Sequence, residues 1–335
     1  MTKVNHYIPL VLLVFSSAMF AWSTVHCTTI QEGEGYVFSH DGVRLFYRVV
    51  GNGPDTLIVL HGGPGNTMES ILPDLRPLEQ NHTVIYYDQR GNGRSDLLFD
   101  DNDLAISHHI KDLEAIRLHF NLQQITLLGN SWGGLLASFY AVAHPDRVER
   151  MVLLSPASPS FKLLEASTNH IHMRIPENSK EKFNMLTNPD KWLTSQNPRQ
   201  ICRMFYDILI PVYFTDTTKS KDMRGDTCAG PIDALKRQQI VNKQIWHSLG
   251  RWDIQRDLQN VNAPILIIHG RDDMISLESS LAWTKAYPDA RLLIIENSGH
   301  MAHIEQPEIF FEAIDIFLKG NWPDRVLQPN EQIPR

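Results

Sequence analysis

A serine flanked by small residues is the first candidate for chemistry in this chain. Residues 129–134 read GNSWGG, with Ser131 after an apolar segment at 125–128 and before a segment of helical character at 135–144. A serine at the tip of a sharp strand-to-helix turn needs small neighbours two residues away on either side, because a side chain there would collide with the adjoining strand or helix. The pattern therefore predicts that Ser131 is an exposed nucleophile.

A serine hydroxyl attacks well only when a base removes its proton, and histidine is the usual base. The chain has 15 histidines, so their positions must decide between them. His300 lies in a loop directly after the last predicted strand, whereas His303 stands near the start of the final predicted helix. A loop at a strand end can fold over the serine turn. We therefore predict His300 as the general base and a structural role for His303.

An acid that orients the histidine should follow the strand predicted at residues 264–269. The sequence GRDD at 270–273 offers Asp272 and Asp273. The acid must turn back towards the imidazole, and in this loop it usually stands three residues after the glycine, which favours Asp273. The resulting chain order, serine then acid then histidine, is one of the known orders of a Ser-His-Asp triad.

The oxyanion of a tetrahedral intermediate requires two preorganised N–H donors. The backbone N–H of Trp132 is the first, because it directly follows the nucleophile. The second should come from a loop after an early strand, and the sequence HGGPG at 61–65 follows the apolar segment 55–60. Glycine lets the backbone approach a substrate closely, so we predict Gly63 as the second donor.

Short apolar segments alternate with segments of helical character along most of the chain. This alternation predicts an α/β fold with a mostly parallel sheet and helices on both faces. We expect a hairpin at 36–51, strands at 55–60, 82–88, 125–128, 148–154, 264–269 and 291–295, and helices at 104–120, 135–144, 280–287 and 307–319. The candidate residues follow predicted strands, and the carboxyl ends of parallel strands are where such sheets carry their chemistry.

Five segments together match the motifs of a known family. They are HGGPG at 61–65, DQRGNGRS at 88–95, GNSWGG at 129–134, GRDD at 270–273 and GH at 299–300. With these motifs the chain resembles the α/β-hydrolase superfamily over residues 36–320, and specifically its proline iminopeptidase-like branch of serine peptidases. That branch typically carries Trp after the nucleophile, as here. We expect the loop at 88–95 to shape the site.

The resemblance implies an α/β-hydrolase fold with a helical cap. We expect a signal peptide or N-terminal anchor at 1–27, a core in two parts at 34–157 and 251–320, a cap at 158–250 and a tail at 321–335. The implied reaction is hydrolysis through an acyl-enzyme, without a cofactor, and the implied substrate is a short peptide or amino-acid amide with a free N-terminus.

The cap sequence departs from that branch. True proline iminopeptidases bind the free amino group of the substrate with acidic cap residues, notably in a Trp-x-x-Trp-Glu type segment. Residues 245–253 read IWHSLGRWD instead, and the cap acids Asp207, Asp216, Asp222 and Asp226 stand in no recognisable amine-binding motif. Two alternatives therefore stay open, a carboxylesterase acting on small esters and, from another class, a triad-bearing ligand receptor with little turnover.

The first 27 residues read as a secretory signal peptide, with an apolar stretch at 8–22 and a possible cleavage signal at 21–23. A retained membrane anchor is the alternative. We expect a secreted or periplasmic protein, in which Cys202 and Cys228 could form a disulfide because the compartment is oxidising.

Composition restricts the partners. The 335 residues are 42% hydrophobic and carry a formal net charge of -7 without a run of Lys or Arg, which argues against nucleic acid. No group of His, Cys and carboxylate residues has convincing metal spacing, so we predict no metal. The expected partner is a small molecule or short peptide, with membrane contact only through an uncleaved N-terminal segment. The oligomeric state stays open.

Overall fold

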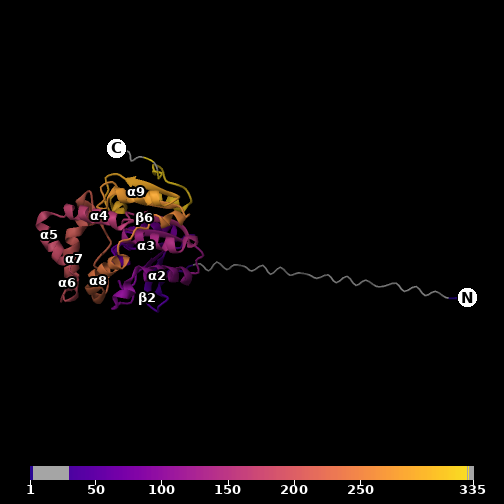
Figure 1. The fold of residues 1–335 in the computed structure, drawn as a ribbon, viewed down its shortest axis with the longest axis horizontal. Coiled ribbons are helices and arrows are strands. Elements are labelled where there is room, and N and C mark those ends of the chain that lie inside the picture. Colours follow the sequence, from indigo (N-terminus) through magenta and orange to yellow (C-terminus); the bar gives the residue numbers. More distant parts are fainter. Residues whose placement is uncertain (3–29, 330, 332–335) are drawn as a thin grey trace.

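A single eight-stranded sheet organises the computed structural model, which describes residues 1–2, 30–329 and 331 (Figure 1). The strand order is β1-β2-β4-β3-β5-β6-β7-β8. The bounds are β1 (Gly33–Phe38), β2 (Arg44–Val50), β3 (Asp55–Leu60), β4 (His82–Tyr87), β5 (Ile125–Asn130), β6 (Val148–Leu154), β7 (Ile265–Gly270) and β8 (Ala290–Ile295). Strand β2 pairs antiparallel with β1 and β4, and the other neighbours are parallel.

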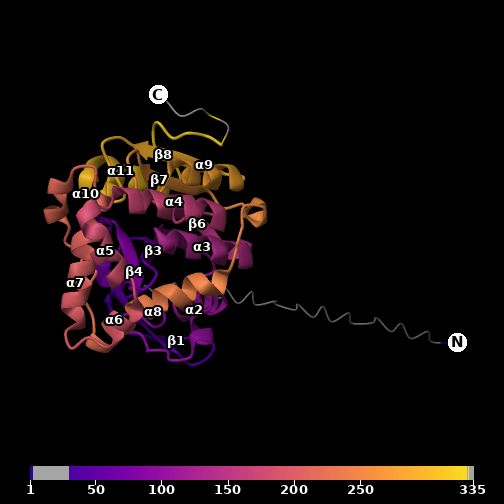
Figure 2. The same ribbon diagram turned by 60° about the vertical axis from the view of Figure 1, so that its left-hand side comes forward.

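Helices cover both faces of this sheet (Figures 1 and 2). Alternate residues of β3 show why: Ile58 and Leu60 belong to one buried apolar cluster, and Leu57 and Val59 belong to another. The first cluster includes residues of α2 (Ile106–His119), α3 (Trp132–Ala143) and α9 (Leu277–Ala286). The second includes residues of α1 (Leu72–Leu75), α10 (Ala302–Glu305) and α11 (Pro307–Leu318). A strand buried on both faces reads as a continuous apolar run, which explains these sequences.

The predicted fold class is confirmed, with differences at some element ends. Helix α3 begins at Trp132, three residues before the expected start, because the turn at Ser131 leads directly into it. Helix α9 also begins early, at Leu277. The sequence conceals the beginning of α3, because two glycines follow Trp132 and glycine has a low helix propensity.

The segment between β6 and β7 is helical. It contains α4 (Phe161–Arg174), α5 (Glu177–Leu186), α6 (Pro189–Leu193), α7 (Pro198–Leu209) and α8 (Ile232–Leu249), which we call the cap helices. They have an apolar cluster of their own, which includes Phe183, Trp192 and Phe205 and extends to Met274 and Ile275 in the loop after β7. The cap helices are therefore packed on one another and onto the strand ends.

The two ends of this helical segment lie side by side. Ser160 and Asp253 form an isolated antiparallel bridge. Next to it, the N–H of Phe161 donates to the carbonyl of Trp252 at 2.9 Å, and the rings of Phe161 and Trp252 lie edge to face. The segment consequently leaves the sheet after β6 and returns before β7 at nearly the same place.

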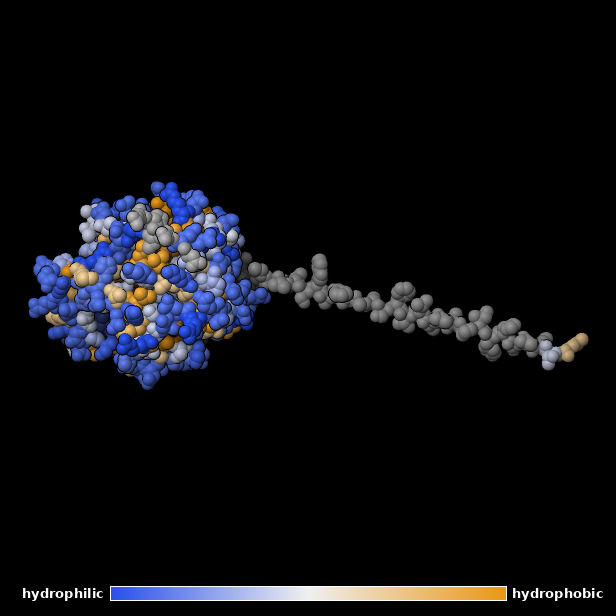
Figure 3. Space-filling model, turned by 45° about the horizontal axis from the view of Figure 1, so that its top comes forward, coloured by the Kyte–Doolittle hydropathy of each residue, from blue (hydrophilic) through white to orange (hydrophobic). Residues whose placement is uncertain are grey.

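Polar residues predominate on the molecular face shown in Figure 3, with hydrophobic residues visible between them near its centre. Within the described ranges, no helix has both the length and the apolarity needed to cross a membrane. The predicted signal peptide or anchor, residues 1–27, lies outside the described residues apart from its first two.

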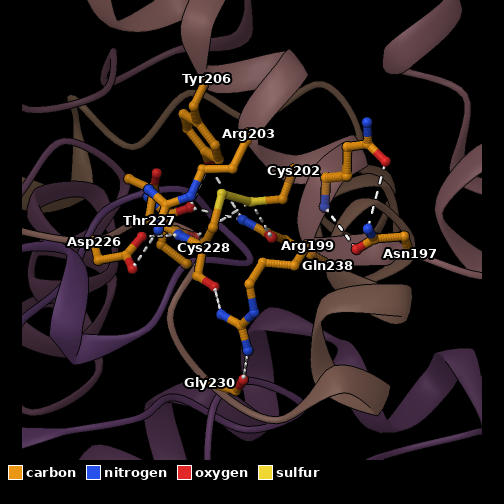
Figure 4. The surroundings of a disulfide bond; sticks show 12 residues. Asn197, Arg199, Cys202, Arg203, Tyr206, Asp226, Thr227, Cys228, Gly230 and Gln238 are labelled. Atoms are coloured by element: carbon orange, nitrogen blue, oxygen red, sulfur yellow. Dashed lines mark hydrogen bonds and ion pairs between the residues drawn. A yellow bond between two sulfur atoms is a disulfide. The ribbon is translucent and has the colours of Figure 1, made fainter.

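A disulfide between Cys202 and Cys228 joins α7 to the loop before α8 (Figure 4). Both cysteines are fully buried. The Arg199 guanidinium supports the same loop, because it donates to the carbonyl of Cys228 and, at 2.9 Å, to that of Gly230. The bond closes a chain segment with a sequence separation of 26 and so restricts the unfolded cap.

Replacing both cysteines, Cys202→Ala with Cys228→Ala, should lower the free energy of unfolding by about 3 kcal/mol, because the unfolded chain regains the entropy of the open loop. Denaturant unfolding of the purified variant, followed by circular dichroism, measures this loss. An unchanged unfolding midpoint would contradict the stabilising role.

Candidate active site

The turn between β5 and α3 presents Ser131 in an unusual backbone conformation, with φ 53° and ψ −116°. This strain is imposed by close packing. A Cβ on Gly129 would lie 2.5 Å from the carbonyl oxygen of Gly133, and a Cβ on Gly133 would collide with the carbonyl of Leu60. A Cβ on Gly134 would lie 2.8 Å from that of Pro156. The glycines therefore allow α3 to start directly against the strands, and they hold Ser131 at the tip.

His300 and Asp273 come together from the loops after β8 and β7. The Nδ1 of His300 lies 2.9 Å from the Oδ1 of Asp273, and both side chains are buried. The N–H of Ile275 also donates to this oxygen at 2.9 Å, which fixes the carboxylate. A neutral imidazole that donates from Nδ1 keeps Nε2 as an acceptor, the state that a general base requires.

The carboxylate of Asp273 lies between two histidines. Its Oδ2 is 3.7 Å from the Nδ1 of His269, a buried residue at the end of β7 that also contacts the Ser280 hydroxyl at 2.9 Å. Burial alone would raise the pKa of Asp273, but the positive charge that His300 and His269 can carry outweighs it and lowers the pKa to about 2. Asp273 is therefore ionised at neutral pH. The sequence does not mark His269 as a site residue, because it reads as one more strand residue.

The loop at 61–65 passes directly over the serine. A Cβ on Gly62 would lie 3.3 Å from the Cβ of Ser131, and Gly63 has a positive φ of 120° that glycine adopts readily. Gly62, Gly63, Ser131 and His300 all line one cavity of about 310 Å³. The structure thus brings the predicted nucleophile, base and glycine donor to a common space.

Gln89, in the loop after β4, connects this glycine loop to the serine turn. Its backbone N–H donates to His61 Nε2 at 3.1 Å, and its side-chain amide donates to the His61 carbonyl at 2.9 Å. Its Oε1 accepts the indole N–H of Trp132 at 2.8 Å. Gln89 therefore holds both loops that carry the predicted oxyanion donors, and His61 serves as its partner in the glycine loop.

The cap helices also bind the glycine loop, through residues that the sequence reasoning did not select. Asn66 Oδ1 accepts the hydroxyl of Tyr206 at 2.6 Å and the amide of Gln238 at 3.1 Å. The amide of Asn242 donates to the carbonyl of Pro64 at 2.8 Å. Gln238 and Asn242 stand one turn apart on α8, a spacing that places them on one face.

The remaining candidates lie elsewhere. The carbonyl oxygen of Asp272 accepts a hydrogen bond from the Arg174 guanidinium at 2.6 Å, and its carboxylate accepts one from the Thr215 hydroxyl at 3.4 Å. Asp273, not Asp272, is therefore the acid beside His300. His303 is buried against Phe310, and burial lowers its pKa to about 3, which keeps it neutral.

One group in the described part of the chain has metal-ligand spacing. Potential ligand atoms of His40, Asp41 and His108 lie within 4.8 Å of one another. The guanidinium of Arg90 already binds Asp41 at 3.0 Å and brings positive charge into the group. A second cation would be repelled, so these residues serve better as an ion pair than as a metal site.

Known proteins share the fold described above. A sequence profile described as the alpha/beta hydrolase fold matches residues 55–307, which is more than half of the chain. The chain belongs to the alpha/beta hydrolase fold family. The predicted hydrolase class and fold are therefore confirmed.

Curated relatives support the branch as well. The chain is 26% identical to a proline iminopeptidase of Heyndrickxia coagulans, over 86% of this chain and 99% of that protein. It is 28% identical to a proline iminopeptidase of Saccharolobus solfataricus, over 86% of this chain and 92% of that protein. The resemblance to the proline iminopeptidase-like branch is confirmed.

Solved structures show the same fold with different named activities. A proline iminopeptidase of Mycobacterium smegmatis aligns with a TM-score of 0.63 at 21% identity, over 86% of this chain and 98% of the other. An esterase from Exiguobacterium antarcticum aligns with a TM-score of 0.63 at 19% identity, over 86% of this chain and 100% of the other. The fold is thus shared by peptidases and esterases, and the cavity must distinguish them.

The lowered pKa of Asp273 leads to a test by pH. Its ionised form stabilises the fold fully above the ordinary pKa of 3.8, and this contribution is lost as the pH falls through about 2. The stability difference between the wild type and Asp273→Asn should therefore shrink by about 2 kcal/mol between pH 5 and pH 2. Urea unfolding of both proteins across this range measures it, and a pH-independent difference would contradict the assignment.

Proposed function

We propose that the protein is a serine hydrolase that uses Ser131 as nucleophile, His300 as general base and Asp273 as the orienting acid. One observation carries the proposal: His300 hydrogen-bonds Asp273 at 2.9 Å and lines the same cavity as Ser131. An ionised Asp273 favours the imidazole tautomer with its free Nε2 towards the reaction and stabilises the imidazolium that forms.

In the proposed first step, His300 takes the proton of the Ser131 hydroxyl while the Ser131 oxygen attacks the substrate carbonyl carbon. The N–H groups of Gly63 and Trp132 stabilise the tetrahedral oxyanion. His300 then gives the proton to the leaving group, the bond to that group breaks, and an ester of Ser131 remains. Water attacks this ester with His300 again as base, which releases the acid and restores the enzyme.

Two substrate classes compete for this reaction. The printed names of the curated relatives favour a proline iminopeptidase-like aminopeptidase on short peptides. The residues around the cavity favour small carboxylic esters or amides without a free amine, because none of the described residues that line it is Asp or Glu. We rank small esters and amides without a free amine ahead of short peptides, because a buried ammonium requires an acidic partner. A cavity of about 310 Å³ suits a small acyl group in either case.

The variant Ser131→Ala should lose at least about a thousandfold in kcat with little change in stability, because the hydroxyl is essential and its removal leaves the fold intact. Hydrolysis of p-nitrophenyl acetate and of proline p-nitroanilide by wild type and variant measures this. Turnover retained in the variant would refute the assignment. Little turnover by the wild type on any ester or anilide, with a ligand-dependent rise in melting temperature, would favour a receptor.

We further propose that the protein is exported. The apolar N-terminal sequence supports this, and so does the disulfide, because disulfides persist in oxidising compartments.

Export can be tested by fractionating cells that express the full chain. We expect the protein outside the cytoplasm, with an N-terminus near residue 24 by Edman sequencing, because the signal should be removed. A full-length cytoplasmic protein would refute the proposal, and a full-length protein in the membrane fraction would identify a retained anchor.

A further inference from the structure

We propose that the cavity selects substrates whose acyl chain ends in a carboxylate and discriminates against those that carry an ammonium. Lys243 is the specificity-determining residue, with Gln239 beside it. This inference rests on the proposed serine hydrolase reaction and names the class of substrate for it.

The charge of the cavity wall is the first argument. Its described lining contains one lysine, Lys243, and the histidine of the site, but no Asp or Glu. Polar groups otherwise come from amides and hydroxyls. A substrate ammonium that entered this space would leave water without gaining an opposite charge, which is costly. A carboxylate would meet a positive charge instead.

Two acids in or near the predicted catalytic loops, Asp273 and Glu305, are already bound. Asp273 contacts His300 and the N–H of Ile275. Glu305 is buried and accepts N–H groups of Gly299 at 2.6 Å and of Thr215 at 2.9 Å. These carboxylates hold the loops in place, so they do not replace the missing amine-binding acid.

Four polar residues of α8 line the cavity, and they form two pairs in which the members stand one turn apart. Gln238 and Asn242 form the first pair, and both are bonded to the segment that contains Pro64 and Asn66. Gln239 and Lys243 form the second pair, and both line the cavity. Within the described chain, neither side chain of this second pair makes a hydrogen bond or ion pair. The amide of Gln239 and the ammonium of Lys243 therefore remain as hydrogen-bond donors for a ligand.

An ammonium and a neighbouring amide N–H match the two oxygens of a carboxylate. Charge-assisted hydrogen bonds of this kind are stronger than neutral ones. Lys243 is exposed, so it stands where the cavity meets solvent and its charge is partly screened. We therefore expect a discrimination of about three- to tenfold, larger at low ionic strength.

Three methyl esters with the same three methylene groups and different ends test this proposal. Monomethyl glutarate ends in a carboxylate, methyl pentanoate in a methyl group and methyl 4-aminobutanoate in an ammonium. Methanol release by the wild type should give the highest kcat/KM for the glutarate ester and the lowest for the amino ester.

Variants of Lys243 then assign the effect. Lys243→Ala should lower kcat/KM for the glutarate ester about three- to tenfold, mainly through KM, and should change kcat/KM for methyl pentanoate much less. Lys243→Glu should raise kcat/KM for the amino ester above the wild-type value. Lys236→Ala is the matched control, since it removes the same charge from the same helix but does not line the cavity.

The outcomes separate the two proposals. A wild type that prefers the amino ester, or a Lys243→Ala variant that changes all three esters equally, would overturn the specificity while Ser131 dependence persists. Loss of Ser131 dependence would overturn the reaction itself. If none of the three methyl esters is turned over, competitive inhibition of p-nitrophenyl acetate hydrolysis by glutarate and by butylammonium measures the same preference, and equal inhibition refutes it.

Discussion

The close packing of the start of α3 against the central strands is the constraint on which the site depends. Gly133 lies so near the carbonyl of Leu60 that no side chain fits between them. This contact brings Ser131 beneath the glycine loop that follows β3, and it forces the strained backbone of this serine. The strain is local, and the surrounding buried sheet sustains it. The predicted nucleophile, Ser131, and the predicted donor, Gly63, are thus positioned by backbone packing rather than by flexible side chains.

The cap helices take part in this rigid arrangement. Through Gln238 and Asn242, helix α8 binds the same glycine loop whose other side is held by Gln89. The residues that directly follow these two, Gln239 and Lys243, line the cavity. One helix therefore supports the loop that carries the predicted oxyanion donor and supplies part of the cavity wall.

Sequence reasoning succeeded where local rules decide the structure. Strand β6 has the predicted bounds because its apolar run is continuous, and Asp273 lies beside His300 because the turn after β7 sets its direction. It failed for Gln238 and Asn242, whose contacts lie more than 170 residues away along the chain. An amide on a helix surface has the same local pattern whether it faces water or a catalytic loop, so only the folded chain reveals it.

The bridge between Ser160 and Asp253 gives the cap the character of a replaceable module. Its entry and exit points are hydrogen-bonded to each other, beside two neighbouring parallel strands. Insertions, deletions or exchanged helices within the cap leave the distance between those points unchanged, and such closed ends are where proteins tolerate inserted segments. Substrate preference in this fold can therefore diverge through the cap while the register of β6 and β7 stays constant.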